Sequence, residues 1–196
     1  MPPSLTTVRP EDAFALVDGT IMYPRLATVD DYPLVEELHA RCSSVSLASL
    51  YAARRPAPPQ TEWRRAAEIP RNRVLLVTPE GRSDHVVAMA SVAEVPNAPE
   101  VGDVAILVAD QPPDAYQSRG LGTRLADLLA EAARNTGFGF LTIKAPWTNW
   151  RMLLIVEHLG GPALPQTPYM RNMALLGLLP NADLDVADEI ELRIAL

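Results

Sequence analysis

The sequence contains a single cysteine, Cys42, among its 196 residues. One cysteine can form neither an internal disulfide nor a cysteine-based metal site. No apolar run approaches the roughly 18 residues of a membrane-spanning helix, and the N-terminal residues lack the charged-then-apolar pattern of a secretory signal. Positive charge is also scarce, because 17 Lys and Arg stand against 24 Asp and Glu, a net charge of −7. We therefore expect a cytoplasmic protein whose partners include neither nucleic acid nor a membrane surface.

What the chain does contain is typical of a soluble globular protein, with 48% hydrophobic and 21% charged residues. Its 19 prolines are nearly double the usual share and cluster between the expected elements, where they indicate stiff loops. The length predicts one domain over residues 1–196, with residues 1–19 as an N-terminal extension.

Hydrophobic periodicity predicts alternating strands and helices. The expected strands are residues 21–26, 73–78, 86–95, 101–109, 138–145 and 189–196. The expected helices are residues 30–41, 46–54, 61–68, 123–135 and 149–159. The strands between 73 and 109 form an antiparallel meander, and the helix from 123 joins two parallel strands in a βαβ unit. The prediction is an α+β fold with one mixed, mostly antiparallel sheet, a central βαβ unit and flanking helices.

Two glycines, Gly120 and Gly122, stand in the stretch YQSRGLGTRL between an apolar strand and the amphipathic helix. The unpaired amides of a first helical turn bind anions, and glycine lets a phosphate approach them. The stretch is not a P-loop, because no lysine follows the second glycine, and Leu125 replaces the third glycine of a dinucleotide fingerprint. A tight turn that binds nothing is the alternative. A serine hydrolase is not supported, because the chain has no Gly-x-Ser-x-Gly motif.

The pattern Gln117-x-x-Gly120-x-Gly122 resembles the acyl-CoA pyrophosphate loop of the GNAT superfamily of N-acetyltransferases. Downstream, Asn149, Met152 and the pair Leu159-Gly160 are similar to a helix of that family. The stretch LHARCSSVSLASLYAARR is also similar to a bacterial protein-lysine-acetyltransferase branch. The resemblance implies a single GNAT-type domain that transfers an acetyl group from acetyl-CoA, as cosubstrate and without a metal, to a primary amine by direct attack.

The resemblance also implies the cofactor-binding residues. Backbone amides near residues 107–109 would bind the pantetheine arm and polarise the thioester, and amides from 117 to 123 would hold the pyrophosphate. The full set is Leu107, Val108, Ala109, Gln117, Ser118, Arg119, Gly120, Leu121, Gly122, Thr123, Asn149 and Met152. Arg119 and Arg124 would either neutralise a phosphate or remain solvated helix charges.

For catalysis, the resemblance places an acidic residue before Ala105, and that residue is Asp103. Asp103 would accept the amine proton through a water, or it is a solvated acid at the start of a strand. Glu100 is the nearby substitute, and Glu94 is a third candidate. Val156 occupies the position of the family's proton-donating tyrosine, so that proton would come from water or from another residue such as Tyr169.

Four questions stay open at this level. The acceptor is either a protein lysine or a small-molecule amine, and the acidic balance favours a cationic one. A non-catalytic acyl-CoA-binding regulatory protein is the alternative function. The segment 110–116 is longer than the usual link, and either moves the entry of the glycine loop or is a neutral surface insertion. The apolar segment 162–188 suits a wall of the acceptor site or a homodimer contact.

Overall fold

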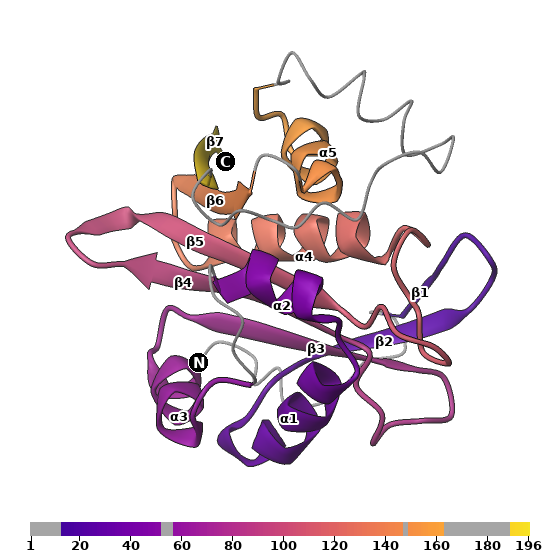
Figure 1. The fold of residues 1–196 in the computed structure, drawn as a ribbon. Helices are drawn as coiled ribbons and strands as arrows, with labels where there is room; N and C mark the ends of the chain where they lie inside the picture. Colours follow the sequence, from indigo (N-terminus) through magenta and orange to yellow (C-terminus); the bar gives the residue numbers. More distant parts are fainter. Residues whose placement is uncertain (1–12, 52–56, 147–148, 163–188) are drawn as a thin grey trace.

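The computed structural model describes residues 13–51, 57–146, 149–162 and 189–196. A seven-stranded sheet runs through the molecule in the order β1-β2-β3-β4-β5-β6-β7 (Figure 1). The strands are β1 (Phe14–Ala15), β2 (Ile21–Leu26), β3 (Arg73–Pro79), β4 (Ala88–Val95), β5 (Ala98–Val108), β6 (Phe140–Pro146) and β7 (Glu189–Ala195). The helices are the 3-10 turn η2 (Val29–Asp31), α1 (Tyr32–Ala40), α2 (Ser44–Tyr51), α3 (Gln60–Glu68), α4 (Leu121–Asn135) and α5 (Trp150–His158).

The predicted α+β architecture is confirmed. All neighbouring strands pair antiparallel except β5 and β6, which are parallel and joined through α4. This is the expected βαβ unit, and β3, β4 and β5 form the expected meander. The chain crosses from β5 to β6 through a helix because parallel strands cannot be joined by a tight turn.

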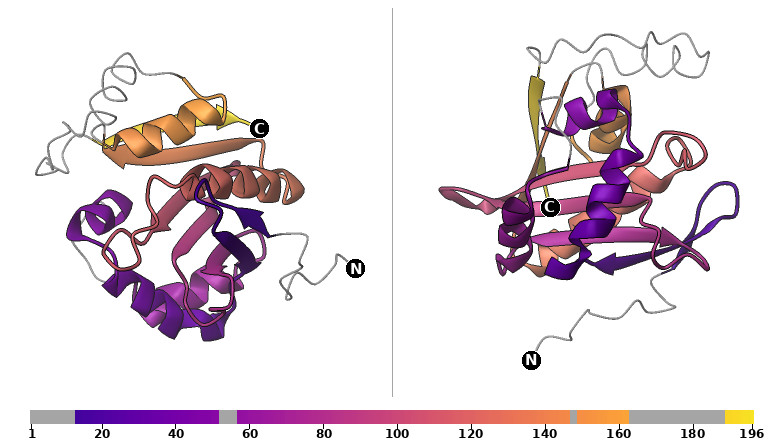
Figure 2. Two further views of the ribbon diagram at one scale, coloured as in Figure 1. Left: turned by 90° about the vertical axis from the view of Figure 1, so that its right-hand side faces the viewer. Right: turned by 60° about the horizontal axis from the view of Figure 1, so that its bottom comes forward.

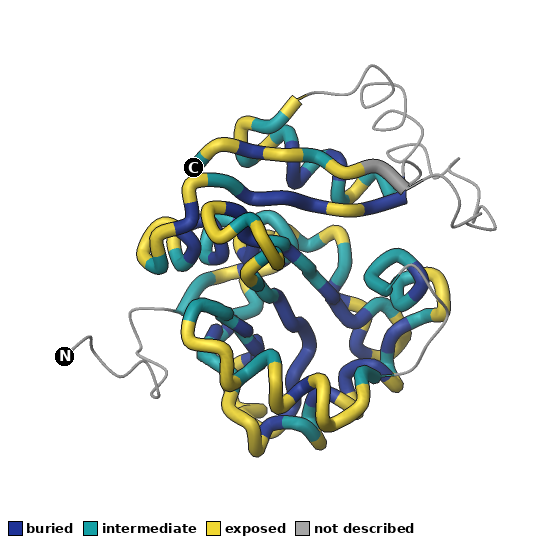
Figure 3. Tube along the Cα trace, turned by 90° about the vertical axis from the view of Figure 1, so that its left-hand side faces the viewer, coloured by how far each residue is buried: buried dark blue, intermediate teal, exposed yellow. Residues whose placement is uncertain are grey.

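Helices cover both faces of the sheet, and each face has its own core (Figure 1). On the α4 and α5 face, Leu121, Leu125 and Leu129 pack against Val104 and Val108 of β5. On the α1 to α3 face, the core includes the residues Val35, Leu38, Trp63, Met89 and Leu107. Leu107 and Val108 lie in different cores because successive strand residues point to opposite faces. The central strands are accordingly buried while the outer turns of the helices are exposed (Figure 3).

Strands β5 and β6 pair over only part of their length. Their register runs from Val101 opposite Phe140 to Val104 opposite Ile143, and it stops there. Both strands continue, β5 to Val108 on the edge of β4 and β6 to Pro146 on the edge of β7. β6 and β7 lie beside α5 at one end of the molecule (Figure 2). The second half of β5 therefore has a strand partner on one edge only.

The strand β1 was not apparent from the sequence, because its two residues are too few for a periodic pattern. Phe14 and Ala15 pair with Met22 and Ile21 of β2. Residues 14–19, which belong to the predicted N-terminal extension, are therefore part of the sheet and its first turn. That turn reaches the glycine stretch, where the Val17 amide donates to the Arg119 carbonyl at 3.3 Å.

Some predictions fall on residues outside the described ranges. These are the end of the expected helix 46–54, the proton-donor candidate Tyr169 and nearly all of segment 162–188, with its proposed dimer contact. Among the described residues, no helix combines the length and apolarity needed to span a membrane.

Candidate active site

The glycine stretch connects β5 to the first turn of α4, and its backbone has two left-handed residues. Ser118 has φ +61° and Gly120, the N-cap of α4, has φ +87°. A left-handed backbone costs a residue with a Cβ about 1–2 kcal/mol, which explains glycine at 120. Positive φ at alternate positions folds successive amides toward one side and forms a concave anion-binding nest.

Gly122 has a different structural reason. A Cβ on this residue would lie 3.2 Å from Cδ1 of Ile155 on α5, so glycine permits α4 and α5 to approach closely at this level. The sequence predicts that both glycines make room for a phosphate. The structure gives each glycine an internal role as well, a left-handed turn at Gly120 and helix packing at Gly122.

The amides of this stretch have few partners. Among the described residues, no backbone carbonyl accepts from the amides of residues 117–123, and the first amide of α4 with such a bond is Arg124, which donates to Gly120. No side chain caps the helix either. The positive end of the α4 dipole adds to these unpaired donors. The geometry suits a phosphate or pyrophosphate group.

The outer edge of β5 supplies a second set of donors. The Ala109 amide donates to the Val87 carbonyl at 2.9 Å, which continues the antiparallel register with β4. Backbone hydrogen-bonding directions alternate along a strand, so the Leu107 amide also points toward β4. The amides of Ile106 and Val108 point to the opposite edge of β5, which has no strand partner after Val104. The predicted amide at Ala109 is thus engaged, and the one at Leu107 points toward β4. The Val108 amide faces the open edge, as does that of Ile106, which the sequence analysis did not name, and cofactor binding there stays a prediction.

A polar network holds the end of β5 against α2. The Asp110 carboxylate accepts from the Ser43 amide at 2.7 Å and from the Ser46 hydroxyl at 2.7 Å, and Ser43 in turn caps α2 by accepting from the Ser46 amide at 3.2 Å. Gln117 donates from Nε2 to the Ser46 hydroxyl at 3.1 Å and to the Val108 carbonyl at 3.4 Å. The side chain of Gln117 is therefore structural, while its amide belongs to the unpaired set.

Three arginines lie near the loop, and two of them turn away to the N-terminal hairpin. Arg119 pairs with Asp18 and lies over the Tyr116 ring, and Arg124 lies 5.5 Å from the centre of the Phe14 ring. Both side chains contact the hairpin, and a phosphate contact by either one stays a prediction. Arg151 at the start of α5, which the sequence analysis missed, donates from Nε to the Ser118 hydroxyl at 3.3 Å. The one feature of the sequence that could have indicated Arg151 is its position in the first turn of the helix that follows β6.

The family model for the Acetyltransferase (GNAT) family matches residues 35–149, which include β5, the glycine loop, α4 and β6. The chain belongs to the GNAT acetyltransferase family. The resemblance seen in the sequence is confirmed, and acetyl transfer is the general activity of this family. No curated protein matches the chain.

Many solved structures share this GNAT fold. The GNAT domain of PAT from S. lividans has a TM-score of 0.70 at 20% identity, over 94% of this chain and 96% of that domain. YncA from Salmonella typhimurium, solved with its cofactor acetyl-CoA, has a TM-score of 0.59 at 20% identity, over 72% and 79%. A ribosomal-protein-alanine N-acetyltransferase from Brucella melitensis has 0.62 at 17%, over 88% and 99%.

The three acidic candidates have different surroundings in this GNAT domain. Asp103 is half-buried on β5, opposite Ala93 of β4 and Thr142 of β6. Glu94 lies opposite Gly102, so it points to the other face of the sheet, where it pairs with Arg71 at 3.0 Å. Glu100 is exposed, 3.6 Å from Arg193. Asp103 is the candidate on the same strand face as Ala105 and Leu107.

The predicted residues of α5 are held by the helix itself. Asn149 is the N-cap, and its side-chain oxygen accepts from the Met152 amide at 3.2 Å. Met152 is half-buried and packs against the α4-side core. Val156, at the position of the family's tyrosine, is fully buried in the same core. Asn149 and Met152 stay predictions as cofactor contacts.

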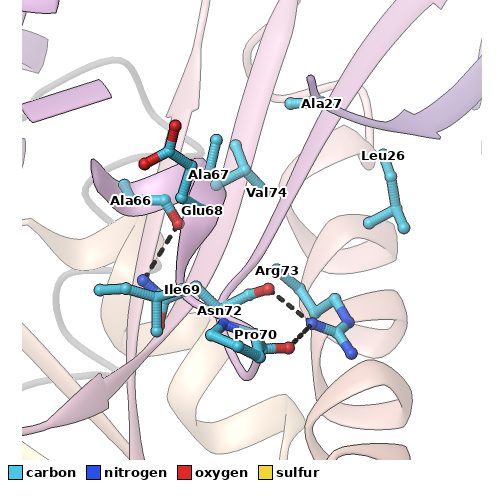
Figure 4. Close-up of a pocket in the computed structure, with 10 residues that line it drawn as sticks. All are labelled: Leu26, Ala27, Ala66, Ala67, Glu68, Ile69, Pro70, Asn72, Arg73 and Val74. Atoms are coloured by element: carbon cyan, nitrogen blue, oxygen red, sulfur yellow. Dashed lines mark hydrogen bonds between the residues drawn. The ribbon is translucent and has the colours of Figure 1, made fainter. Parts of the chain in front are cut away.

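Two other features carry no acyl-transfer chemistry. Burial raises the pKa of the Cys42 thiol to about 12, and the charge of Asp110 adds to the effect, so this thiol stays protonated. A cavity of about 170 Å³ lies between the end of α3 and the start of β3 (Figure 4). Its polar side chains Asn72 and Arg73 donate to nearby backbone carbonyls (Figure 4).

Within the described ranges, no cluster of three His, Cys, Asp or Glu residues could hold a metal.

Proposed function

We propose that the chain is an N-acetyltransferase that moves an acetyl group from acetyl-CoA to a primary amine by direct attack. The observation that carries this proposal is the pair of donor sets at the end of β5. The amides of residues 117–123 have no backbone partner among the described residues, and the Val108 edge has no partner strand after Val104. An acyl-CoA has a pyrophosphate for the first set and a thioester arm for the second. The acetyl-CoA complex of yncA, a protein of the same fold, supports the assignment.

When bound, acetyl-CoA supplies the activated acetyl group. The loop amides then hold its pyrophosphate, and the Val108 amide donates to the thioester oxygen and stabilises the negative charge that develops there. Asp103 lies upstream of the free edge, on the part of β5 that still pairs with β6. We assign to it the role that the resemblance implies, which is to accept the proton of the attacking amine through a water. Val156 has no proton to give, so water returns the proton to the departing thiolate.

The acceptor is a primary amine, carried either by a small molecule or by a protein lysine. The net charge of −7 favours a cationic acceptor through long-range attraction. The Brucella melitensis protein acts, by its name, on an alanine of ribosomal protein, which keeps a protein amine among the candidates.

A second candidate function is acyl-CoA binding without turnover. It is favoured by Val156, which is fully buried in the core where the family has a proton-donating tyrosine. Both functions require the same cofactor site, so they differ only in whether the thioester is consumed.

Acetyl-CoA binding, measured by calorimetry, tests the site. Ser118→Asp places a carboxylate at the loop mouth, whereas Ser118→Asn has the same shape without charge, and both residue types tolerate the φ of +61°. We expect wild type and Ser118→Asn to bind, and Ser118→Asp to bind at least about tenfold more weakly through charge repulsion. No binding by wild type would refute the proposed function, and equal binding by the Asp and Asn variants would refute the loop as the phosphate site.

Release of free thiol with a panel of amines separates the two functions. An enzyme releases thiol faster than background with at least one amine, and a binding protein with none. With an active amine, Asp103→Asn is expected to lower kcat by about 10²–10⁴ while the calorimetric Kd for acetyl-CoA stays the same. A variant with wild-type kcat would show that Asp103 is not the base.

A further inference from the structure

Arg151 differs from Arg119 and Arg124 in that its side chain contacts the glycine loop and not the N-terminal hairpin. Its Nε donates to Ser118, and its guanidinium lies 4.5 Å from the centre of the Trp150 ring. Among the described residues, no carboxylate lies within 4.0 Å of it and no group accepts from its terminal nitrogens. An arginine carries five N–H donors, so most of its donor capacity remains at the loop mouth.

The position of Arg151 is fixed from two directions. The contact between Gly122 and Ile155 brings α5 against the first turn of α4, on the helix that carries Arg151. The left-handed Ser118 places its hydroxyl within reach of the guanidinium. Arg151 is exposed to solvent, although desolvation by the surrounding protein lowers its pKa and the negative charge of Asp110 opposes that shift. An exposed guanidinium without an ion pair is open to a bound phosphate.

We propose that Arg151 binds the pyrophosphate together with the loop amides, and that the chain thereby selects nucleotide-bearing thioesters over phosphate-free pantetheine thioesters. This inference rests on the proposed function, since it concerns the same cofactor site. A guanidinium presents two parallel donors to a phosphate, which an ammonium group cannot do. The loop amides alone would hold a phosphate from one side, and Arg151 adds a charged donor from a second helix.

The test measures binding of three ligands by calorimetry: acetyl-CoA, its dephospho form without the 3′-phosphate, and acetyl-pantetheine without any phosphate. Arg151→Gln is expected to weaken the first two by about 10- to 100-fold, the loss typical of hydrogen bonds to charged groups. Its affinity for acetyl-pantetheine, measured at millimolar concentrations, should equal that of wild type. Arg151→Lys should recover part of the lost affinity, because lysine keeps the positive charge but lacks the two parallel donors of the guanidinium.

Arg134→Gln is the matched control, because it removes the same charge from an exposed residue in the last turn of α4. It should change each affinity by less than about twofold, as expected for a screened charge at a distance. The affinity of wild type for acetyl-CoA should also fall more steeply with salt than that of Arg151→Gln.

Three results would overturn the inference while leaving the proposed function intact. Unchanged acetyl-CoA affinity in Arg151→Gln would show that the guanidinium binds no phosphate. Equal losses for all three ligands would indicate a structural role on α5. A loss confined to acetyl-CoA would assign Arg151 to the 3′-phosphate instead. If wild type itself binds no acetyl-CoA, the proposed function fails and this inference fails with it.

Discussion

Two consecutive segments between β5 and α4 use their polar groups in opposite ways. In the segment 110–116, Asp110 accepts from Ser43 and Ser46 at the start of α2. The buried Asp114 carboxylate lies 3.0 Å from His85, 3.6 Å from Arg41 and 3.5 Å from Arg82. In the glycine loop that follows, the amides of residues 117–123 have no backbone partner among the described residues. The polar groups of the first segment are paired within the protein, whereas the amides of the second have no backbone acceptor among the described residues.

The difference suggests that the segment 110–116 anchors the glycine loop that follows it. A loop that keeps donors unpaired must be held by its neighbours, because it gains no hydrogen bonds of its own. Asp114 fixes the preceding segment to the end of α1 and to the β3–β4 connection. The segment 110–116 is therefore anchored, which argues against a neutral surface insertion. Gln117 joins the two segments, since its side chain is bonded to Ser46 and Val108 while its amide faces the site.

The largest effect on stability should come from the anchored segment. Asp114→Asn removes the negative charge that faces Arg41 and Arg82, while the amide oxygen of asparagine can still accept a hydrogen bond. Breaking such a buried pair costs several kcal/mol, and we reduce the figure to about 2–3 kcal/mol because Arg82 is half exposed. The melting temperature should fall by about 4–12 °C, measured by calorimetry or circular dichroism.

Asp84→Asn is the control for this substitution, because Asp84 is an exposed acid on the same β3–β4 connection. It should change stability by less than about 0.5 kcal/mol. A similar loss in both variants would mean that net charge, and not the contacts of Asp114, sets the stability. A large loss of acetyl-CoA affinity in folded Asp84→Asn would show that the connection belongs to the site.

The sequence predicted most of this fold, because strands and helices with a clear hydrophobic period reveal themselves locally. The βαβ unit and the meander were of this kind, and all of their ends agreed within three residues; β4, for example, begins at Ala88 and not at 86. β1 was missed because two residues carry no period. Its recognition depends on pairing with β2, which only the folded chain shows.

The site was predicted less completely, because local motifs do not specify non-local partners. The glycine loop was found from its spacing, but the direction of the Ala109 amide depends on the register with β4. For Arg119 the sequence left phosphate contact and a solvated charge as alternatives, and its partner Asp18 comes from the N-terminal hairpin. Arg151 was missed because its proximity to Ser118 depends on how α5 packs against α4.

The stability that Asp114 contributes should depend on pH. Burial raises the pKa of this carboxyl. The hydrogen bond from His85 and the charges of Arg41 and Arg82 lower the pKa by more than burial raises it, so the net pKa is below the ordinary value. The contribution is therefore full above the unfolded pKa of about 4 and is lost as the pH falls through the lower folded value. The difference in unfolding free energy between wild type and Asp114→Asn should shrink from pH 6 to pH 3. A constant difference over this range would contradict the assignment.

The smallest effect separates the role of a glycine in folding from its role in binding. Gly120→Ala and Gly81→Ala each place a Cβ at a positive φ, +87° and +74°, and neither new atom would meet another atom closer than 3.5 Å. Both should lose about 1–2 kcal/mol of stability from backbone strain alone. Only Gly120→Ala should also weaken acetyl-CoA binding, because Gly81 lies in the turn after β3 and Gly120 orients the loop amides. Equal acetyl-CoA affinity in the two variants would remove the glycine loop from the site and leave it as a turn that begins a helix.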